Sequence, residues 1–422
     1  MSFEKVSVFG LGYIGLPTAA ALATQKISVL GIDVNQEAVD TINRGEIHIV
    51  EPELDVAVQA AVTRGYLRAS VKPEPADAFL IAVPTPFKEN HEPDLSYIES
   101  AAKAIAPVLR AGNLVILEST SPVGTTEKLS EWLALAREDL SFPHTAADDS
   151  DILVAHCPER VLPGQVMYEL AHNDRVIGGV SPRCTEAARK LYETFVRGEC
   201  VETNARTAEM CKLTENAARD VNIAFANELS LICDGFNIDV WELIQLANRH
   251  PRINILQPGP GVGGHCIAVD PWFIISQARE DSTLMQAARK INDQKPNWVI
   301  DKVHASVRSF LKDNPGKTVS DVTVACFGLA FKADIDDLRE SPALQIALAL
   351  SETHPGKVIG VEPNIEKLPV TVADSKLLQE SVEQALLSAD VYVMLVDHKE
   401  FKTFNPGLAG KVTVDTRGVW QS

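Results

Sequence analysis

The sequence lacks the features of a secreted or membrane-bound protein. It has no long apolar stretch, and its start, MSFEKVSVFG, shows neither a basic leader nor a cleavage site of small residues. Cysteine is scarce and scattered: there are seven, an odd number, with no CxxC pair. This pattern fits reduced thiols better than disulfides or a zinc site. We therefore predict a cytoplasmic protein without membrane association and without a metal.

Positive charge is also in short supply. Acids outnumber bases 57 to 39, and the formal net charge is −18. Because nucleic acids are held by clustered Lys and Arg, this balance argues against a nucleic-acid partner. An anionic small molecule would have to be held by local groups, such as helix N-termini and a few convergent cations.

What is present is a repeated pattern of strands and helices. A chain of 422 residues that is 45% hydrophobic can form two or three domains. Short apolar runs alternate with helical segments, which is typical of a parallel sheet wrapped by helices. These runs cover residues 5–10, 27–33, 78–83, 114–119, 152–157, 322–328, 357–363, 391–397 and 412–416.

A long helical segment without Gly or Pro, residues 205–234, separates the two sets of strands. We expect an α/β fold in which two Rossmann-like doubly wound domains are joined by a long central helix. The predicted regions are residues 1–204, 205–311 and 312–422. The central helix carries a larger apolar face than one domain needs, so we also expect a homodimer or higher homo-oligomer.

A glycine-rich loop follows the first strand. Gly10, Gly12 and Gly15 form GLGYIG, and Asp33 ends the second strand. In a dinucleotide site the first Gly allows the tight turn, the second allows close approach of the pyrophosphate, and the third allows helix packing. The alternative is a purely structural glycine turn. Asp33 would accept hydrogen bonds from ribose hydroxyls and repel a 2′-phosphate, so the pattern predicts NAD rather than NADP.

Two further loops, VPTP at 83–86 and ESTSPVGTTE at 118–127, fall at the carboxyl ends of strands. Ligands bind at this edge of open α/β sheets, so the hydroxyls of Thr85, Thr120 and Thr126 could face a cofactor. Ordinary turn chemistry is the alternative explanation for each threonine.

The long helix places Lys212, Asn216 and Arg219 on one polar stripe. A solvated surface stripe is the plain alternative. Downstream, PGVGGHC places Cys266 at the end of a Gly-rich loop, where nearby donors could lower its pKa and make it reactive. The alternative is a small buried hydrophobe. His265 has no second ligand at metal spacing, so it does not predict a metal site.

In the third region, FGLAFKADIDDLRES follows a strand and carries Lys332 and Arg339. Two strand-and-helix domains with loops of this kind indicate that two nucleotide-like groups are bound. Binding of two nucleotide-like groups is unusual for a dehydrogenase of simple hydroxy acids.

The chain resembles the UDP-glucose and GDP-mannose 6-dehydrogenase family over almost its whole length. The resemblance rests on five segments that occur in the family's order: GLGYIGLP, VPTP, KLTENAARDVNIAFANE, VGGHCIAVDP and GLAFKADIDDLRESP. It implies that region 1–204 binds NAD, that region 205–311 carries the catalytic Cys loop and the dimerisation helix, and that region 312–422 binds a UDP-sugar.

Within the family, three segments are most similar to the branch that oxidises UDP-N-acetyl-D-mannosamine: CPERVLPGQV at 157–166, NRHPRINILQPGPGVGGHCIAVDPWF at 248–273 and LVDH at 395–398. UDP-glucose dehydrogenases typically carry a second Glu where this chain has Pro163, which leaves Glu159 without its usual companion. The resemblance implies oxidation at C6 to the uronate for cell-surface polysaccharide synthesis. UDP-N-acetylglucosamine and UDP-glucose are the alternative substrates.

The resemblance also implies residue roles. Cys266 would capture the aldehyde as a thiohemiacetal and then a thioester, and Lys212 would serve proton transfer at the C6 oxygen. Further catalytic candidates are Asn216, Asp270, Glu159 and Thr120. The expected NAD contacts are Gly10, Gly12, Tyr13, Ile14, Gly15, Asp33, Thr85, Thr126 and Arg339. The expected contacts to the sugar nucleotide are Arg160, Val161, Lys212, Asn216, Arg219, His250, Arg252, Gly263, Phe331, Lys332 and Arg417, with His250 and Arg252 reaching the neighbouring subunit's site.

Two rival functions remain open on the sequence alone. A two-electron hydroxy-acid dehydrogenase would need the glycine loop and a Lys but not Cys266. A nucleotide-sugar binding module would need none of the catalytic residues.

Overall fold

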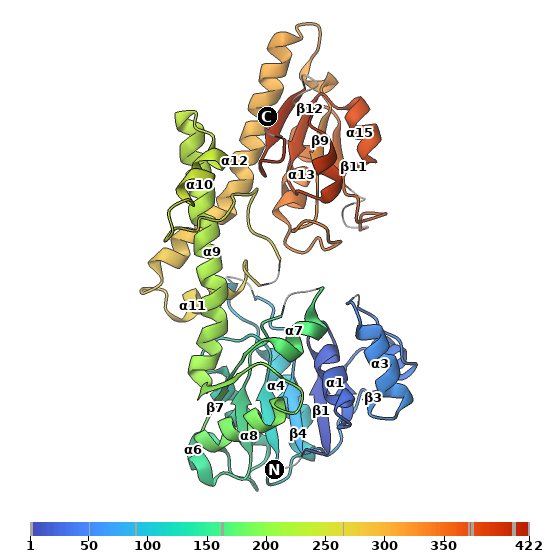
Figure 1. Cartoon of the computed structure of the whole chain (residues 1–422), viewed down its shortest axis with the longest axis vertical. Coiled ribbons are helices and arrows are strands. Elements are labelled where there is room, and N and C mark those ends of the chain that lie inside the picture. Colours follow the sequence, from blue (N-terminus) through green and yellow to red (C-terminus); the bar gives the residue numbers. More distant parts are fainter. Residues whose placement is uncertain are drawn as a thin grey trace. The chain divides into compact units, whose positions relative to one another are not determined.

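The computed structural model of the chain describes residues 3–49, 51–88, 91–161, 164–264, 266–369, 372, 375–406 and 411–420 (Figure 1). Two β-sheets organise it, one in each of two units. Unit 1 comprises Met1–Glu215 and Trp272–Gln277, and unit 2 comprises Asn216–Pro271 and Ala278–Ser422. The division of the chain into domains at residues 1–204, 205–311 and 312–422 stays a prediction.

The sheet of unit 1 has eight strands in the order β3-β2-β1-β4-β5-β6-β7-β8. The strands are β1 (Lys5–Phe9), β2 (Ser28–Ile32), β3 (Leu67–Ser70), β4 (Ala78–Ile81), β5 (Leu114–Leu117), β6 (Leu153–His156), β7 (Arg175–Gly179) and β8 (Cys200–Asn204). The helices are α1 (Gly15–Thr24), α2 (Gln36–Asn43), α3 (Leu54–Thr63), α4 (Ser96–Ile105), α5 (Thr125–Ala136), α6 (Pro143–Ala146), α7 (Val166–His172) and α8 (Pro182–Tyr192).

Two strands of unit 1, β7 and β8, run opposite to the other six. β7 pairs with β6 antiparallel, while the other neighbouring strands pair parallel. Doubly wound sheets often carry reversed strands at one edge, so the fold class is unchanged.

The central strands of unit 1 are apolar throughout because both sheet faces are covered. β4 (AFLI) and β5 (LVIL) are buried at every position. Their side chains divide between two hydrophobic clusters, one containing α1, α3 and α8 and the other containing α4 and α5. Burial on both faces explains why these strands read as continuous apolar runs rather than as alternating ones.

The sheet of unit 2 repeats the arrangement of the first five strands of unit 1. Its order is β11-β10-β9-β12-β13, and all pairs are parallel. The strands are β9 (Val324–Phe327), β10 (Val358–Val361), β11 (Leu378–Gln379), β12 (Val391–Met394) and β13 (Val412–Asp415), and the helices beside them are α13 (Pro342–Thr353) and α15 (Val382–Ser388). The expectation of two Rossmann-like domains is confirmed.

Two helices cross from one unit to the other. The expected central helix is α9 (Ala205–Phe236), and the unit boundary falls between Glu215 and Asn216 within it. The second is α11 (Asp270–Gln277), in which the boundary falls between Pro271 and Trp272. Unit 2 also contains α10 (Val240–Ala247) and α12 (Thr283–Asp313).

The short return segment 272–277 is anchored in unit 1 by rings and hydrogen bonds. Phe273 is buried and meets the Phe87 ring edge-on at 6.0 Å between centroids. The His91 ring stacks on Trp272 at 4.2 Å. The Gln277 side chain accepts a hydrogen bond from Val123 N and donates one to Val123 O. Unit 1 is therefore built from two separate pieces of the sequence.

Among the described residues, no helix is both long enough and apolar enough to cross a lipid bilayer.

Candidate active site

The glycine loop of unit 1 has the geometry of a dinucleotide site. A Cβ on Gly10, which has φ of 85°, would lie 2.6 Å from the Ala82 carbonyl oxygen, and a Cβ on Gly15 would lie 1.8 Å from Gly10 O. Both positions therefore require glycine. Gly12 is exposed, and a Cβ there would meet nothing within 4 Å, so space remains for a ligand.

The start of α1 lies in this loop. Tyr13 is exposed and Ile14 is half-buried directly before the helix. Among the described residues no side chain caps the helix N-terminus, so its amides can serve an anionic group such as a pyrophosphate.

Asp33 lies immediately after β2, where the sequence predicts a ribose acceptor. Its carboxylate accepts hydrogen bonds from Leu11 N and Asn35 N, both at 2.9 Å, and the side chain is half-buried. The next residue, Val34, is 97% exposed and uncharged. This environment favours ribose hydroxyls over a 2′-phosphate, which would need a cation here.

The two threonine loops lie side by side at the ends of β4 and β5. Thr85 Oγ1 donates to the Thr120 carbonyl at 2.6 Å. Thr126, by contrast, is fully buried, and both its backbone N and its Oγ1 donate to Glu209 of α9. Its hydroxyl hydrogen is therefore already used within the protein, and its contact to NAD stays a prediction.

Sequence reasoning missed Glu209, although a signal existed. The residue lies four positions before the buried Leu213 and eight before the buried Ala217, so it falls on the apolar face of α9. An acid on such a face needs partners, and its burial raises its pKa. Gly124 N donates to it as well, at 2.6 Å.

Glu159 is held in a buried ion pair at the end of β6. Its Oε2 lies 2.6 Å from Arg175 Nη1, and its Oε1 accepts from Arg160 N at 2.6 Å. The next carboxylate in this cluster is Glu118, which accepts from Tyr192 Oη at 2.6 Å. Burial raises the pKa of Glu118 to about 7. The sequence did not reveal Glu118, Arg175 or Tyr192.

Arg160 and Val161 follow Glu159 in the chain. Arg160 pairs with Glu215 of α9, at 2.7 Å between Nη2 and Oε1, and Val161 is half-buried. Pro163, on which the argument against UDP-glucose depends, lies outside the described residues, and so does His265.

Three of the expected catalytic residues come together within unit 2. Asn216 Nδ2 donates to Asp270 Oδ2 at 2.5 Å, and Asp270 N donates to the Cys266 carbonyl at 2.8 Å. Cys266 is exposed at the end of the Gly-rich loop, and Asp270 is buried in the first turn of α11. Lys212, half-buried, precedes Asn216 by one turn of α9, and the exposed Arg219 follows it by one turn.

The other cysteines are unlike Cys266. Cys157, Cys184, Cys233 and Cys326 are buried, Cys200 and Cys211 are half-buried, and these six, all within the described ranges, form no disulfide. Burial raises the pKa of both Cys157 and Cys326 to about 12. These buried thiols are therefore poor nucleophiles.

The Gly-rich loop packs against the segment that follows β9. A Cβ on Gly263 would lie 2.5 Å from the Glu340 carbonyl oxygen and 2.9 Å from Phe331 Cβ, and a Cβ on Gly264 would lie 2.9 Å from the Phe331 ring. Gly264 N also donates to Arg339 O at 3.3 Å. The structure thus brings Gly263 and Phe331, two of the expected sugar-nucleotide contacts, into the neighbourhood of Cys266.

Arg417 also lies beside this loop. A Cβ on Gly259 would be 2.8 Å from its Nη1. Asp397 holds the guanidinium through Nε at 3.0 Å and Nη2 at 2.8 Å. Burial raises the pKa of Asp397, but Arg417 and Lys402 outweigh this effect and keep it below its usual value.

The remaining predicted residues of unit 2 are surface side chains. Lys332 is exposed, and Arg339 is exposed and paired with Asp337 at 2.6 Å. His250 and Arg252 are exposed in the turn after α10, where Arg252 N donates to His250 Nδ1 at 3.4 Å. Over the part of the chain that the structure describes, no hydrogen bond or ion pair links these two to the Gly-rich loop.

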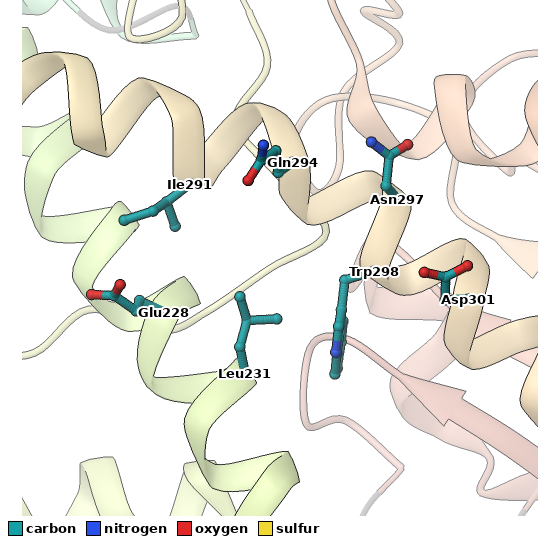
Figure 2. Close-up of a pocket in the computed structure, with 7 residues that line it drawn as sticks. All are labelled: Glu228, Leu231, Ile291, Gln294, Asn297, Trp298 and Asp301. Atoms are coloured by element: carbon teal, nitrogen blue, oxygen red, sulfur yellow. The ribbon is translucent and has the colours of Figure 1, made fainter.

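A separate hollow of about 480 Å³ opens between α9 and α12 (Figure 2). Its lining residues are Glu228, Leu231, Ile291, Gln294, Asn297, Trp298 and Asp301. It contains none of the predicted site residues, and the cluster around Cys266 carries the chemically competent groups. We therefore place the candidate active site at Cys266 and not at this hollow.

Comparisons with known proteins show the family to which the chain is similar. Sequence models of the UDP-glucose/GDP-mannose dehydrogenase family match the chain in three consecutive parts: the NAD binding domain over residues 4–196, the central domain over 206–294 and the UDP binding domain over 325–422. The UDP-N-acetyl-D-mannosamine dehydrogenase of Yersinia pestis is 63% identical over 422 residues, which cover 100% of both chains.

Two further relatives cover nearly the full length. The NDP-N-acetyl-D-galactosaminuronic acid dehydrogenase of Ralstonia nicotianae is 60% identical over 100% of this chain and 97% of its own. A solved structure of a UDP-D-ManNAc dehydrogenase from Pyrococcus horikoshii is 38% identical, with a TM-score of 0.87 over 99% of this chain and 96% of that chain.

Proposed function

The chain belongs to the UDP-glucose/GDP-mannose dehydrogenase family, and from this premise we propose that it oxidises UDP-N-acetyl-D-mannosamine at C6 to UDP-N-acetyl-D-mannosaminuronate. The observation that carries the proposal is the cluster of Asn216, Cys266 and Asp270 beside Gly263 and Phe331. The full-length identity of 63% to a UDP-N-acetyl-D-mannosamine dehydrogenase supports the choice of sugar.

NAD is the proposed cofactor, and the residues present fit it. The exposed Gly12 leaves room for a pyrophosphate, and Asp33 offers a carboxylate to a ribose with no cation next to it in sequence. We propose that Gly10, Gly12, Tyr13, Ile14, Gly15, Asp33, Thr85, Thr126 and Arg339 contact it. When bound, NAD accepts the hydride that leaves C6 in each of the two oxidations.

Lys212 and Cys266 have different roles in the reaction at C6: Lys212 serves proton transfer, and Cys266 forms a covalent bond to the carbon. Lys212, directly or through a water, takes the proton of the alcohol and stabilises the oxyanion that develops. The Cys266 thiol then adds to the aldehyde carbon: an S–C bond forms and the thiol proton passes to the oxygen, giving a thiohemiacetal. Loss of the second hydride and of the hydroxyl proton leaves a thioester.

Water completes the reaction. It adds to the thioester carbon, the C–S bond breaks, and the carboxylate and the Cys266 thiol are released. Asn216 and Asp270, joined at 2.5 Å, are placed to orient this water or the oxyanion, and Glu159 and Thr120 are further candidates. A well-placed donor to the oxyanion contributes about 3 kcal/mol of barrier lowering.

The sugar nucleotide is proposed to lie against residues of several segments. Phe331, Gly263 and Arg417 surround the Gly-rich loop, and Asp397 fixes Arg417. The complete proposed set is Arg160, Val161, Lys212, Asn216, Arg219, His250, Arg252, Gly263, Phe331, Lys332 and Arg417.

The chain is further proposed to work in the cytoplasm as a homodimer or higher homo-oligomer. Six cysteines without disulfides fit a reducing compartment. Exposed apolar side chains on α9, namely Phe225, Ile232 and Phe236, support assembly through this helix, and Leu231, Ile291 and Trp298 in the hollow of Figure 2 extend the apolar surface to α12. His250 and Arg252 would then reach the neighbouring subunit's site.

The stoichiometry of NADH tests the reaction. A limiting pulse of UDP-N-acetyl-D-mannosamine with excess NAD is expected to yield two NADH per sugar and a transient adduct on the peptide that contains Cys266. Cys266→Ala should abolish the four-electron oxidation while the affinities for NAD and sugar nucleotide stay within a few fold, because the thiol interacts strongly only after the aldehyde exists. One NADH per sugar would indicate a two-electron dehydrogenase, and none a binding module.

The choice of sugar is tested by kcat/KM for UDP-linked N-acetylmannosamine, N-acetylglucosamine, N-acetylgalactosamine and glucose. N-acetylgalactosamine belongs in this panel because of the Ralstonia relative at 60% identity. A preference of about tenfold for any other sugar, equal to about 1.4 kcal/mol of transition-state binding, would overturn the assignment.

A further inference from the structure

Two acids occupy the same place in the two sheets. Asp33 follows β2 and Glu362 follows β10, and each of these strands lies beside the first strand of its sheet. Gly10 and Gly328 start the loops opposite them, with φ of 85° and 87°, and each donates its N–H to the last residue of the neighbouring strand at 2.8 Å. The acid in unit 2 therefore corresponds to the cofactor-binding acid of unit 1.

The surroundings of the two acids differ. Asp33 is half-buried, whereas the Glu362 side chain is fully buried. Glu362 Oε2 accepts from Leu329 N at 2.8 Å, Ala330 N at 3.0 Å and His398 Nε2 at 3.0 Å, while Oε1 accepts from Asn364 N at 3.1 Å. Burial alone would raise the pKa of Glu362, but the hydrogen bonds from His398 and Leu329 keep it below its usual value. Both of its oxygens therefore accept hydrogen bonds from the protein itself and not from a ribose.

His398 links this acid to the loop after β9. Its Nδ1 lies 2.9 Å from both Asp334 N and Asn364 Nδ2. Because an amide N–H can only donate, Nδ1 must be the accepting nitrogen, and the ring hydrogen sits on Nε2 and points at Glu362. The ring is fully buried and packs edge-on to Phe401 at 5.4 Å. Lys399 N donates to Asp334 Oδ1 at 3.0 Å, so both the backbone N and the side chain of Asp334 are hydrogen-bonded to residues 398 and 399.

These bonds fix both ends of segment 329–334. Glu362 holds the amides of Leu329 and Ala330, and His398 holds the amide of Asp334. Between these points lie Phe331 and Lys332, and the Phe331 ring packs on Gly264. His398 belongs to the LVDH segment, whose role the proposed reaction leaves unexplained.

We propose that the buried Glu362–His398 pair positions segment 329–334 for the nucleotide of the substrate. This role rests on the proposed function, since that function makes Phe331 and Lys332 ligand contacts. Neither Glu362 nor His398 touches the substrate. The acid that receives a ribose in unit 1 instead shapes a binding loop in unit 2.

Two substitutions of one histidine test the proposal, with UDP as the probe and isothermal titration as the measurement. In His398→Asn the Asn oxygen lies near the place of Nδ1 and can still accept from Asp334 N. In His398→Gln the amide lies near the place of Nε2, so the acceptor for Asp334 N is lost. We expect His398→Gln to raise the Kd for UDP about tenfold and His398→Asn to stay within about threefold of wild type.

Matched measurements separate positioning from loss of folding. The Kd for NAD should be unchanged in both variants, because the glycine loop lies in unit 1. His354→Gln serves as the control, since His354 is also buried in unit 2 but its ring bonds to Val322 O, before the start of β9; it should bind UDP like the wild type. Amide exchange in residues 329–334 should rise in His398→Gln alone.

Equal UDP affinity in all proteins, or equal weakening in the Asn and Gln variants, would refute the positioning role. If His398→Gln did not fold, faster exchange of amides 329–334 in the folded Glu362→Gln protein would support the role, and unchanged exchange would refute it. A wild-type protein that bound NAD but no UDP would overturn the proposed function, and this role with it.

Discussion

Glu118 and Glu159 show how differently two buried carboxylates can be stabilised. Glu159 forms an ion pair with Arg175 at 2.6 Å, so its charge is compensated. Glu118 has only the hydroxyl of Tyr192, and its second oxygen is buried without a partner among the described residues. A buried carboxylate without a cation is favoured in its neutral form. Protonation of Glu118 should consequently be detectable in solution, through the pH dependence of stability.

We predict that Glu118→Gln changes how stability depends on pH. The pKa of Glu118 is about 7 in the folded protein against 4.5 as its reference value, so between these pH values the folded state keeps a proton that the unfolded state has lost. Stability must then fall as pH rises through this window, by on the order of 3 kcal/mol, and the Gln variant lacks this fall. Urea unfolding of both proteins at pH 5, 6, 7 and 8 measures the difference.

Other titrating groups cancel in this comparison. Burial lowers the pKa of His156 to about 3, but His156 is present in both proteins. Glu74→Gln is the control, because Arg68 and Lys5 lower the pKa of Glu74 to about 2 and it stays ionised over the whole range. Parallel stability curves for wild type and Glu118→Gln would show that Glu118 is ionised in the fold.

At the scale of elements, a chain of buried hydrogen bonds ties the Gly-rich loop to α9 and α12. Gly259 N donates to Asn227 Oδ1 at 2.9 Å, and Asn227 Nδ2 donates to Asn292 Oδ1 at 2.9 Å. Asn292 Nδ2 in turn donates to Asp220, which pairs with Arg289 at 2.7 Å. The loop that carries Cys266 is thus anchored at Gly259 to the two longest helices.

Asn227→Ala should therefore loosen the Cys266 loop. It leaves Gly259 N and Asn292 Oδ1 buried without this partner, which costs about 1–3 kcal/mol of stability. We expect kcat to fall about tenfold with little change in the KM for NAD, since only the placement of the thiol changes. The rate of Cys266 alkylation by iodoacetamide reports the same change directly.

The control lies on the same helix. Asn222 is exposed and bonds only to Ala218 O, so Asn222→Ala should alter stability by less than about 0.5 kcal/mol and leave kcat unchanged. Asn227→Asp keeps an acceptor for Gly259 N and should recover part of the lost rate. If Asn227→Ala kept the wild-type kcat and the wild-type rate of Cys266 alkylation, the predicted anchoring of the Cys266 loop through Asn227 would be wrong.

How far the sequence predicts these elements depends on where their partners lie. The strands before the glycine loops and the helix from 205 were predicted because their patterns are local. The reversal of β7 and β8 was not, because it depends on how β7 pairs with β6 and β8. Cys266, Asp270 and Asn216 were predicted as a group from motifs and resemblance, whereas Arg175 and Glu118 read as ordinary strand-end residues whose contacts span 16 and 74 positions.

At the scale of the whole molecule, the hollow between α9 and α12 bears on assembly. Leu231 and Trp298 line it together with acidic Glu228 and Asp301 (Figure 2). A mixture of apolar and polar side chains of this kind is compatible with a subunit interface, which combines an apolar core with a polar rim.

We predict that the wild-type protein sediments as a dimer or larger at micromolar concentration and that Leu231→Arg shifts it toward the monomer, because a charged guanidinium loses its hydration when it is buried in place of an apolar side chain. Leu387→Arg is the control, since Leu387 is 87% exposed on α15, far along the chain from α9. A fully active wild-type monomer would contradict the proposed assembly. Unchanged sedimentation of Leu231→Arg would place the interface elsewhere.

The discontinuity of unit 1 has a consequence for how the protein is made. Its last segment, Trp272–Gln277, is translated about 60 residues after Glu215. The ribosome adds about 5–20 residues per second, so this segment follows roughly 3–12 seconds later. Until then the apolar contact between Phe87 and Phe273 is missing, and the nascent unit exposes a surface that chaperones can bind. Completion of unit 1 must therefore wait for synthesis of the Cys266 loop, so every chain that closes its NAD-binding unit already carries the proposed nucleophile.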